Sequence, residues 1–133
     1  MMTLNSAATL RLLLALDAAV SGATGIAMIA AADFLEPLFN VPALVMRSAG
    51  AMLLPFAAMV FFFSRPAQLT PSRAWAVVAL NVAWVVASIL VLVTGWIQPT
   101  TLGLAFVLFQ AVVVAGLAEL QFTGLRRSGA AAG

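Results

Sequence analysis

The stretch that decides the fold is Leu12-Leu13-Leu14-Ala15-Leu16-Asp17-Ala18-Ala19-Val20, in which one carboxylic acid interrupts a run of apolar side chains. The apolar run extends from about residue 7 to residue 32, which is longer than the roughly 20 residues that a helix needs to cross about 30 Å of hydrocarbon. An acid near the centre of such a helix costs about 2.5–3.5 kcal/mol on insertion scales. Asp17 should therefore face other helices, and it needs a partner, a proton or a function.

Three more apolar runs of similar length follow, at about residues 43–63, 74–96 and 102–122. Charged and turn-forming residues separate the runs, as expected where a helix stops. None of the runs alternates in the way that a transmembrane strand does. The sequence therefore predicts one all-α domain over residues 1–133, built as a bundle of four transmembrane helices.

The first apolar run also has the position of a secretory signal peptide. Its length, the acid at Asp17 and the presence of only one preceding positive charge, Arg11, argue against this alternative. We expect the chain to keep all four spans.

Composition narrows the functional class. Hydrophobic residues make up 65% of the chain and charged residues 8%, against roughly 25% charged residues in a typical soluble domain. The basic residues are scattered arginines, and the net charge of +2 gives no basic stripe for nucleic acid. The absence of Cys and His removes the thiolate and imidazole groups that most metal sites and catalytic centres use. We expect no metal, no cofactor, no nucleic-acid partner and no enzymatic activity.

The distribution of arginine predicts the orientation in the membrane. Arginines lie near the start of the first span, on both sides of the second connection and after the fourth span, at Arg11, Arg65, Arg73, Arg126 and Arg127. The first connection instead carries Asp33 and Glu36, and the third carries no charge. By the positive-inside rule, both termini and the middle connection should be cytoplasmic.

Arg47 is the exception to this pattern, because it lies about one turn inside the outer end of the second span. We favour an outward orientation, in which the side chain anchors the helix at the interface and meets Asp33 or Glu36. In the alternative, Arg47 points inward and offers a cationic site to an anionic lipid headgroup.

A search for repeats pairs the polar residues of the two halves. Sliding the chain by 64 residues places Asp17 on Asn81, and a slide of 63 places Arg47 on Gln110. Two parallel-repeated helical hairpins, related by an axis along the membrane normal, would produce this pattern. Chance matches of Ala and Leu produce it equally well in such a composition, so both interpretations stay open.

Depth in the membrane suggests which polar residues meet. At about 1.5 Å per residue, Asp17 and Asn81 lie at similar depths, with Ser21 four residues along on the same face as Asp17. We expect a contact between Asp17 and Asn81. Asp17 is either a neutral packing residue or a protonation site, and the sequence favours neither.

Two further groups follow from the same reasoning. Arg11 and Glu119 lie near the cytoplasmic face, and we expect an ion pair that serves structure or topology rather than proton relay. For Asn81 and Gln110, interhelical hydrogen bonding is favoured over the lining of a transport path.

The layout of the chain resembles that of a known group. The first hairpin has an acidic-Pro turn ending Asn40-Val41-Pro42 and then Arg47-Ser48-Ala49-Gly50, and the second runs from Asn81-Val82-Ala83-Trp84 to Gly124-Leu125-Arg126-Arg127. These features resemble small four-helix bacterial inner-membrane proteins of unknown function, and in helix number the chain is similar to the DoxX-like group. The resemblance implies a bacterial inner-membrane location. It carries over no catalytic or cofactor residue.

Three functions stay open on the sequence. The first, which we favour, is a non-enzymatic accessory or interaction protein in the lipid bilayer that forms a homo-oligomer or joins a larger membrane complex. The second is a small transporter or channel that uses Asp17 as a protonation site, with Ser21, Asn81 and Gln110 along the path. The third is an anionic-lipid-binding protein that uses Arg47.

Overall fold

The structure is a computed structural model that describes the backbone of residues 4–132 and the side chains of residues 7–127. Within that part the chain has no strand and forms five helices: α1 (Leu4–Ala30), α2 (Ala32–Phe39), α3 (Ala43–Phe63), α4 (Pro71–Val93) and α5 (Thr101–Ala132). The four long helices are apolar enough to cross a membrane, over Ala7–Ala30, Ala43–Phe63, Pro71–Val93 and Thr101–Arg127. The predicted all-α bundle with four spans is confirmed.

The connection between the first two spans is a short helix, α2, and the prediction of a turn there was wrong. Asp33 lies in the first turn of α2, where a carboxylate complements the positive end of the helix dipole. Asn40 ends α2 in the left-handed conformation, with φ 53 and ψ 41, and its backbone N–H bonds to the carbonyl of Glu36. Asp and Asn are common in turns, but here they serve as a first-turn acid and a C-terminal cap.

The third span begins and ends about three residues earlier than predicted. The Thr70 hydroxyl accepts a hydrogen bond from the backbone N–H of Arg73 at 3.2 Å, and Pro71 occupies the first helical position. Both features favour the start of a helix at this point. Beyond the other end, Gly95 has a φ of 73, a conformation that is open to glycine and ends the helical path.

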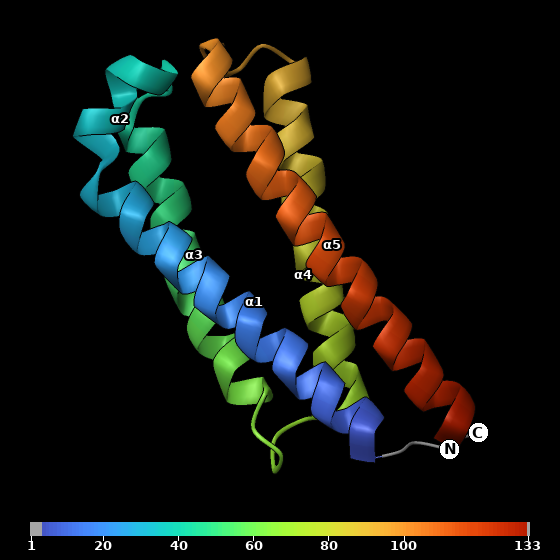
Figure 1. Cartoon of the computed structure of the whole chain (residues 1–133). Coiled ribbons are helices and arrows are strands. Elements are labelled where there is room, and N and C mark those ends of the chain that lie inside the picture. Colours follow the sequence, from blue (N-terminus) through green and yellow to red (C-terminus); the bar gives the residue numbers. More distant parts are fainter. Residues whose placement is uncertain (1–3, 133) are drawn as a thin grey trace.

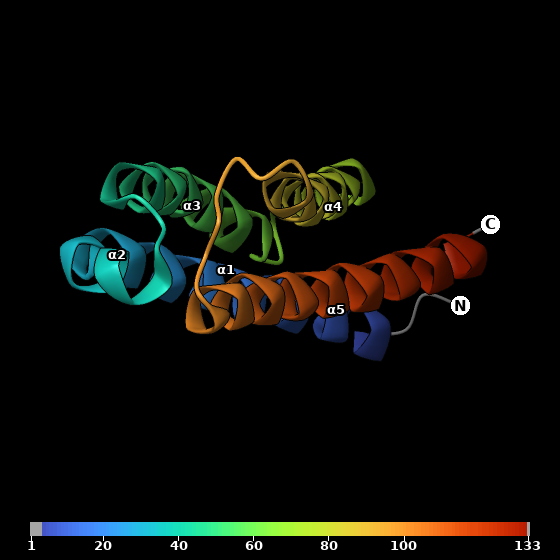
Figure 2. The ribbon, with the colours of Figure 1, turned by 90° about the horizontal axis from the view of Figure 1, so that it is seen from above.

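The helices form two hairpins that lie side by side. Seen from above, α1 and α5 form one layer and α3 and α4 the other (Figure 2). The 64–70 connection lies at the same end as the start of α1 and the end of α5, and α2 lies at the opposite end (Figure 1). Helix α1 packs closely on α3 and also on α5, and α4 packs on α5, whereas α3 and α4 have the least contact of the neighbouring spans. One side of the bundle is therefore more loosely packed than the other.

Two glycines bring α1 and α3 together. A Cβ atom added to Gly50 would lie 2.7 Å from the carbonyl oxygen of Gly25, and one added to Gly25 would lie 2.9 Å from that of Gly50. Small residues at such a crossing let two helix backbones approach within a membrane. This contact fixes the geometry of the first hairpin.

The end of the bundle that carries α2 is tied to the second hairpin by hydrogen bonds. Thr100 donates from its backbone N–H to the carbonyl of Phe39 at 3.0 Å and from its hydroxyl to the carbonyl of Leu38 at 2.6 Å. Asn40 Nδ2 donates to the carbonyl of Gln98 at 2.7 Å. Helix α2 therefore links the two hairpins at this end.

Candidate functional site

Asp17 lies near the middle of its span and is buried, with 1% of its surface exposed. Its carboxylate accepts three hydrogen bonds: from Asn81 Nδ2 to Oδ2 at 2.7 Å, from Gln121 Nε2 to the same oxygen at 2.8 Å, and from Ser21 Oγ to Oδ1 at 3.3 Å. The predicted contact between Asp17 and Asn81 is confirmed, and Ser21 lies beside them as its spacing indicates.

These side chains form a network that joins three helices. Asn81 Nδ2 also donates to Gln121 Oε1 at 3.2 Å, so the amides on α4 and α5 bond to each other as well as to Asp17 on α1. Helices α1 and α4 lie diagonally across the bundle (Figure 2), and the hydrogen bond between Asp17 and Asn81 spans this diagonal. We call Asp17, Ser21, Asn81 and Gln121 the polar core.

Gln121 is fully buried and was not among the site residues predicted from the sequence. Gln121 lies 11 residues after Gln110, about three helical turns, so the two amides share one face of α5. That spacing was a usable indication in the sequence. At this depth the sequence reasoning predicted a role only for Glu119, the charged residue two positions before Gln121.

Gln110 belongs to a second cluster, away from Asp17. Its Oε1 accepts from Trp84 Nε1 at 2.7 Å, and its Nε2 donates to Ser88 Oγ at 3.1 Å and to the Val107 carbonyl at 2.9 Å. These bonds join α4 to α5 within the second hairpin. The structure thus gives Gln110 an interhelical hydrogen-bonding position, and it does not bring Gln110 into contact with the polar core.

Arg11 and Glu119 form no ion pair in the part of the chain that the structure describes. Glu119 is exposed and lines a pocket together with Val82 and Val86 of α4. Equal depth places two residues at one level of the membrane but does not make them face each other, which is why this expected pair is not formed.

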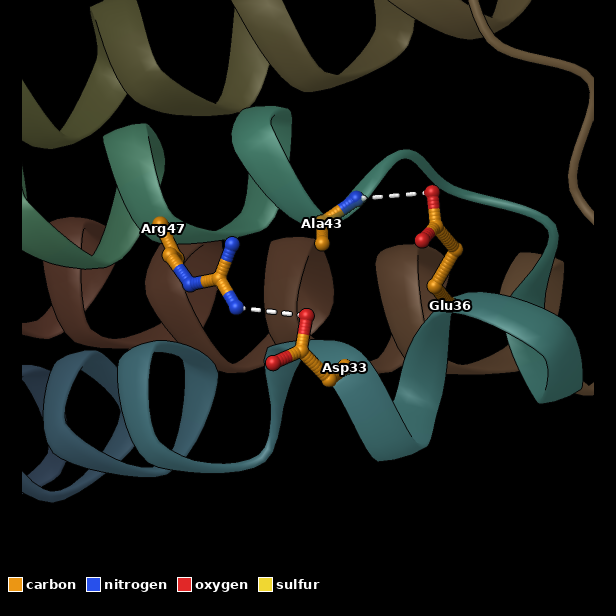
Figure 3. Close-up of polar contacts among 4 residues, drawn as sticks. All are labelled: Asp33, Glu36, Ala43 and Arg47. Carbon is orange, nitrogen blue, oxygen red and sulfur yellow. Dashed lines mark hydrogen bonds and ion pairs between the residues drawn. The ribbon is translucent and has the colours of Figure 1, made fainter.

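The end of the bundle near α2 carries the ion pair that the described residues do form. Arg47 on α3 contacts Asp33 on α2 at 2.5 Å, with side-chain exposures of 44% and 82% (Figure 3). Beside it, Glu36 Oε2 accepts a hydrogen bond from the backbone N–H of Ala43 at 3.1 Å, which satisfies a free donor in the first turn of α3. The predicted contact of Arg47 with Asp33 is confirmed.

A cavity of about 510 Å³ lies between α3 and α4, where the bundle is loosely packed. We call it the α3–α4 crevice. Its walls are largely apolar and include Met52, Pro55, Phe56, Met59, Leu80, Ala83 and Ala87. Met52 and Leu80 are 64% and 47% exposed, so the crevice opens sideways, toward the position of the lipid.

The polar core supplies the polar part of this crevice. Ser21 and Asn81 both line it, whereas Asp17 does not. Asn81 is 3% exposed, and its Nδ2 makes both of its hydrogen bonds within the polar core. Among the hydrogen bonds of the described residues the Asn81 side chain takes part only through Nδ2, so Oδ1 of this crevice-lining residue is a buried acceptor without a partner.

The chemistry that these groups can perform is limited. No group of three or more His, Cys, Asp or Glu side chains that could hold a metal ion occurs among the described residues. The polar core contains one carboxylate, two amides and a hydroxyl, which can bind a hydrogen-bonding group or carry a proton. It contains no paired base and nucleophile of the kind that covalent catalysis needs.

Comparison of the chain with protein-family models, with curated proteins and with solved structures gives no match. The resemblance in layout to the DoxX-like group stays a prediction from the sequence.

Proposed function

We propose that this chain is a non-enzymatic accessory or interaction protein of the bacterial inner membrane, and that it binds its partner at the α3–α4 crevice. The proposal places both termini on the cytoplasmic side, because the arginines cluster at that end of the spans. The polar core holds the two hairpins together, so that the crevice keeps its shape.

The observation that carries this proposal is the unequal packing of the two sides of the bundle. Helix α1 packs on α5, while α3 and α4 have little contact and leave the crevice open. Pockets of this size between the helices of a bundle are common sites for binding. Ala83 and Ala87 give α4 a shallow surface along the opening, and two methionines, Met52 and Met59, provide adaptable side chains opposite it.

Native mass spectrometry of the protein, released from its own membrane in mild detergent, tests the proposal. We expect wild type to retain an additional component, whether a second copy, another chain or a small molecule. Ala83→Trp should fill the crevice and remove that component. Val112→Trp is the matched control, because Val112 is 69% exposed on α5 and lines no described pocket. A bare monomer in wild type, or equal retention by both variants, would contradict the proposal.

Proton-coupled transport is a second candidate, and one observation favours it. Ser21 and Asn81 line the crevice and both bond to Asp17, so a single hydrogen bond separates this carboxylate from the cavity. In liposomes, Asp17→Asn should then abolish a proton-coupled flux while the exposed Asp33→Asn leaves it unchanged. If flux is equal in the two variants, Asp17 is not the protonation site.

Anionic-lipid binding through Arg47 receives less support. The guanidinium already contacts the carboxylate of Asp33, which neutralises much of the charge that would attract a headgroup. Lipid binding that is unchanged in Arg47→Gln would exclude this role.

A further inference from the structure

We propose that the occupant of the α3–α4 crevice is a neutral, lipid-soluble molecule with a hydroxyl group on an apolar chain, and that its hydroxyl donates to Asn81 Oδ1. This inference rests on the proposed function and names the chemical class of the partner. It depends on three observations: an unpartnered acceptor, the size of the crevice and its depth in the membrane.

The acceptor defines the polar end of the ligand. Only 3% of the surface of Asn81 is exposed, so the residue is 97% buried. A buried carbonyl without a donor is costly. The Ser21 hydroxyl donates to Asp17 but keeps lone pairs that can accept. Ser21 and Asn81 therefore both offer acceptors, and the indole N–H of Trp84, which also lines the crevice, already donates to Gln110. The complementary ligand group is a donor.

The size and walls of the crevice define the rest of the ligand. A volume of about 510 Å³ lies in the range of small-molecule sites, about 300–1,000 Å³. Cα atoms of α3 and α4 approach within 8 Å of each other, whereas a helix with its side chains is about 10–12 Å across. A partner helix cannot pass between them along their whole length. A single flexible chain can lie against Met52, Phe56 and Leu80.

The depth of Asn81 favours a neutral ligand. Asn81 lies at the middle of α4, which runs from Pro71 to Val93. Charged groups are costly at this depth in a bilayer, and phospholipid headgroups remain at the interface. A hydroxyl group on an apolar chain carries one hydrogen-bond donor and no charge. Such a molecule can therefore reach the middle of the bilayer.

Trp84 allows the proposal to be tested, because it lines the crevice. In a Trp75→Phe/Trp96→Phe background, the fluorescence of Trp84 reports on a brominated molecule held beside it. The probes are ω-bromo-octanol, its methyl ether and bromo-octane, each added to the protein in phosphatidylcholine nanodiscs. The ether keeps the chain and the oxygen but has no donor.

We expect the alcohol to quench Trp84 at about tenfold lower mole fraction in the lipid than the ether or the alkane, as one additional hydrogen bond predicts. Asn81→Leu should abolish this preference. Because Asn81→Leu also removes donors to Asp17, a second variant is needed. Ala87→Phe should block the crevice without touching the polar core, and Val112→Phe is its matched control on α5.

Equal quenching by the three probes would overturn the proposal, because the crevice would then recognise only the chain. Stronger quenching by ω-bromo-octylamine than by the alcohol would also overturn it, in favour of a cationic ligand. Failure here is distinct from failure of the proposed function. A second copy or another chain retained in the mass spectrum, without a preference for alcohol, would leave the interaction role standing and remove only the hydroxyl ligand.

Discussion

Gln121 Nε2 donates to Asp17 Oδ2 at 2.8 Å, although 104 residues separate the two side chains in the sequence. This bond joins the last span to the first. Asn81 on α4 donates to the same oxygen and so joins a further span to them. Interhelical hydrogen bonds of this kind fix which helix faces meet inside a bilayer, where apolar surface alone gives little preference.

Removing the acceptor should destabilise the bundle. In Asp17→Leu the amides of Asn81 and Gln121 lose their common acceptor, and we expect a loss of about 1–3 kcal/mol in the free energy of unfolding. Asp17→Asn keeps a carbonyl oxygen and should lose less. Circular dichroism during unfolding in mixed detergent and dodecyl sulfate micelles measures both.

The matched control for these variants is Asp33→Asn, because the Asp33 side chain is 82% exposed. It should change stability by no more than about 0.5 kcal/mol. If Asp17→Leu has the same free energy of unfolding as wild type, the polar core does not stabilise the fold.

The crossing of α1 and α3 should not tolerate a methyl group. In Gly50→Ala the new Cβ would lie 2.7 Å from the backbone oxygen of Gly25, and overpacking of this kind costs about 1–3 kcal/mol. Gly116→Ala is the control, because nothing lies within 4 Å of its added Cβ. It should be neutral, or more stable by up to about 1 kcal/mol. The same unfolding assay measures the stability of both variants. Equal stability of the two would contradict a tight crossing.

The orientation of the chain can be measured directly, because the sequence has no cysteine. A single cysteine at Ala67, in the connection between α3 and α4, should react with a membrane-impermeant maleimide only after the cells are permeabilised. A cysteine at Gln98, in the connection between α4 and α5, should react in spheroplasts without permeabilisation. Both positions are exposed. The reverse pattern would show that the arginine distribution predicts the wrong orientation.

The ion pair between Arg47 and Asp33 should contribute little to stability. Its side chains are 44% and 82% exposed, and exposed pairs typically contribute about 0–1 kcal/mol. A double-mutant cycle with Arg47→Ala and Asp33→Ala should therefore give a coupling energy in this range that falls as salt is added. A coupling well above it, insensitive to salt, would indicate that lipid or a partner shields the pair.

The sequence predicted the four spans, because length and hydropathy determine them. It also predicted the contact between Asp17 and Asn81, because a buried acid within a span needs a polar partner at its own depth. It did not predict which residues complete the polar core. Gln121 and Gln110 lie on one face of α5, yet one reaches Asp17 while the other bonds to Trp84. The two amides lie 11 residues apart, about 16.5 Å along α5, so each meets different neighbours from the other helices, and local sequence does not specify those neighbours.

Helix α2 shows a second limit of the sequence. Asp33 and Asn40 are typical of turns, and only their positions relative to the helix end decide between a turn and a capped helix. The expected pair of Arg11 and Glu119 failed for a related reason. Depth along a helix can be counted from the sequence, but the direction in which a side chain faces depends on neighbours that are distant in the chain.

The sideways opening of the α3–α4 crevice determines how its occupancy must be measured. A molecule that reaches it diffuses in the plane of the membrane, and every acyl chain of the surrounding lipid competes with it. Its affinity is therefore a mole fraction relative to lipid, not a concentration in water. Two laboratories that use the same dose at different lipid-to-protein ratios would measure different occupancies for the same protein.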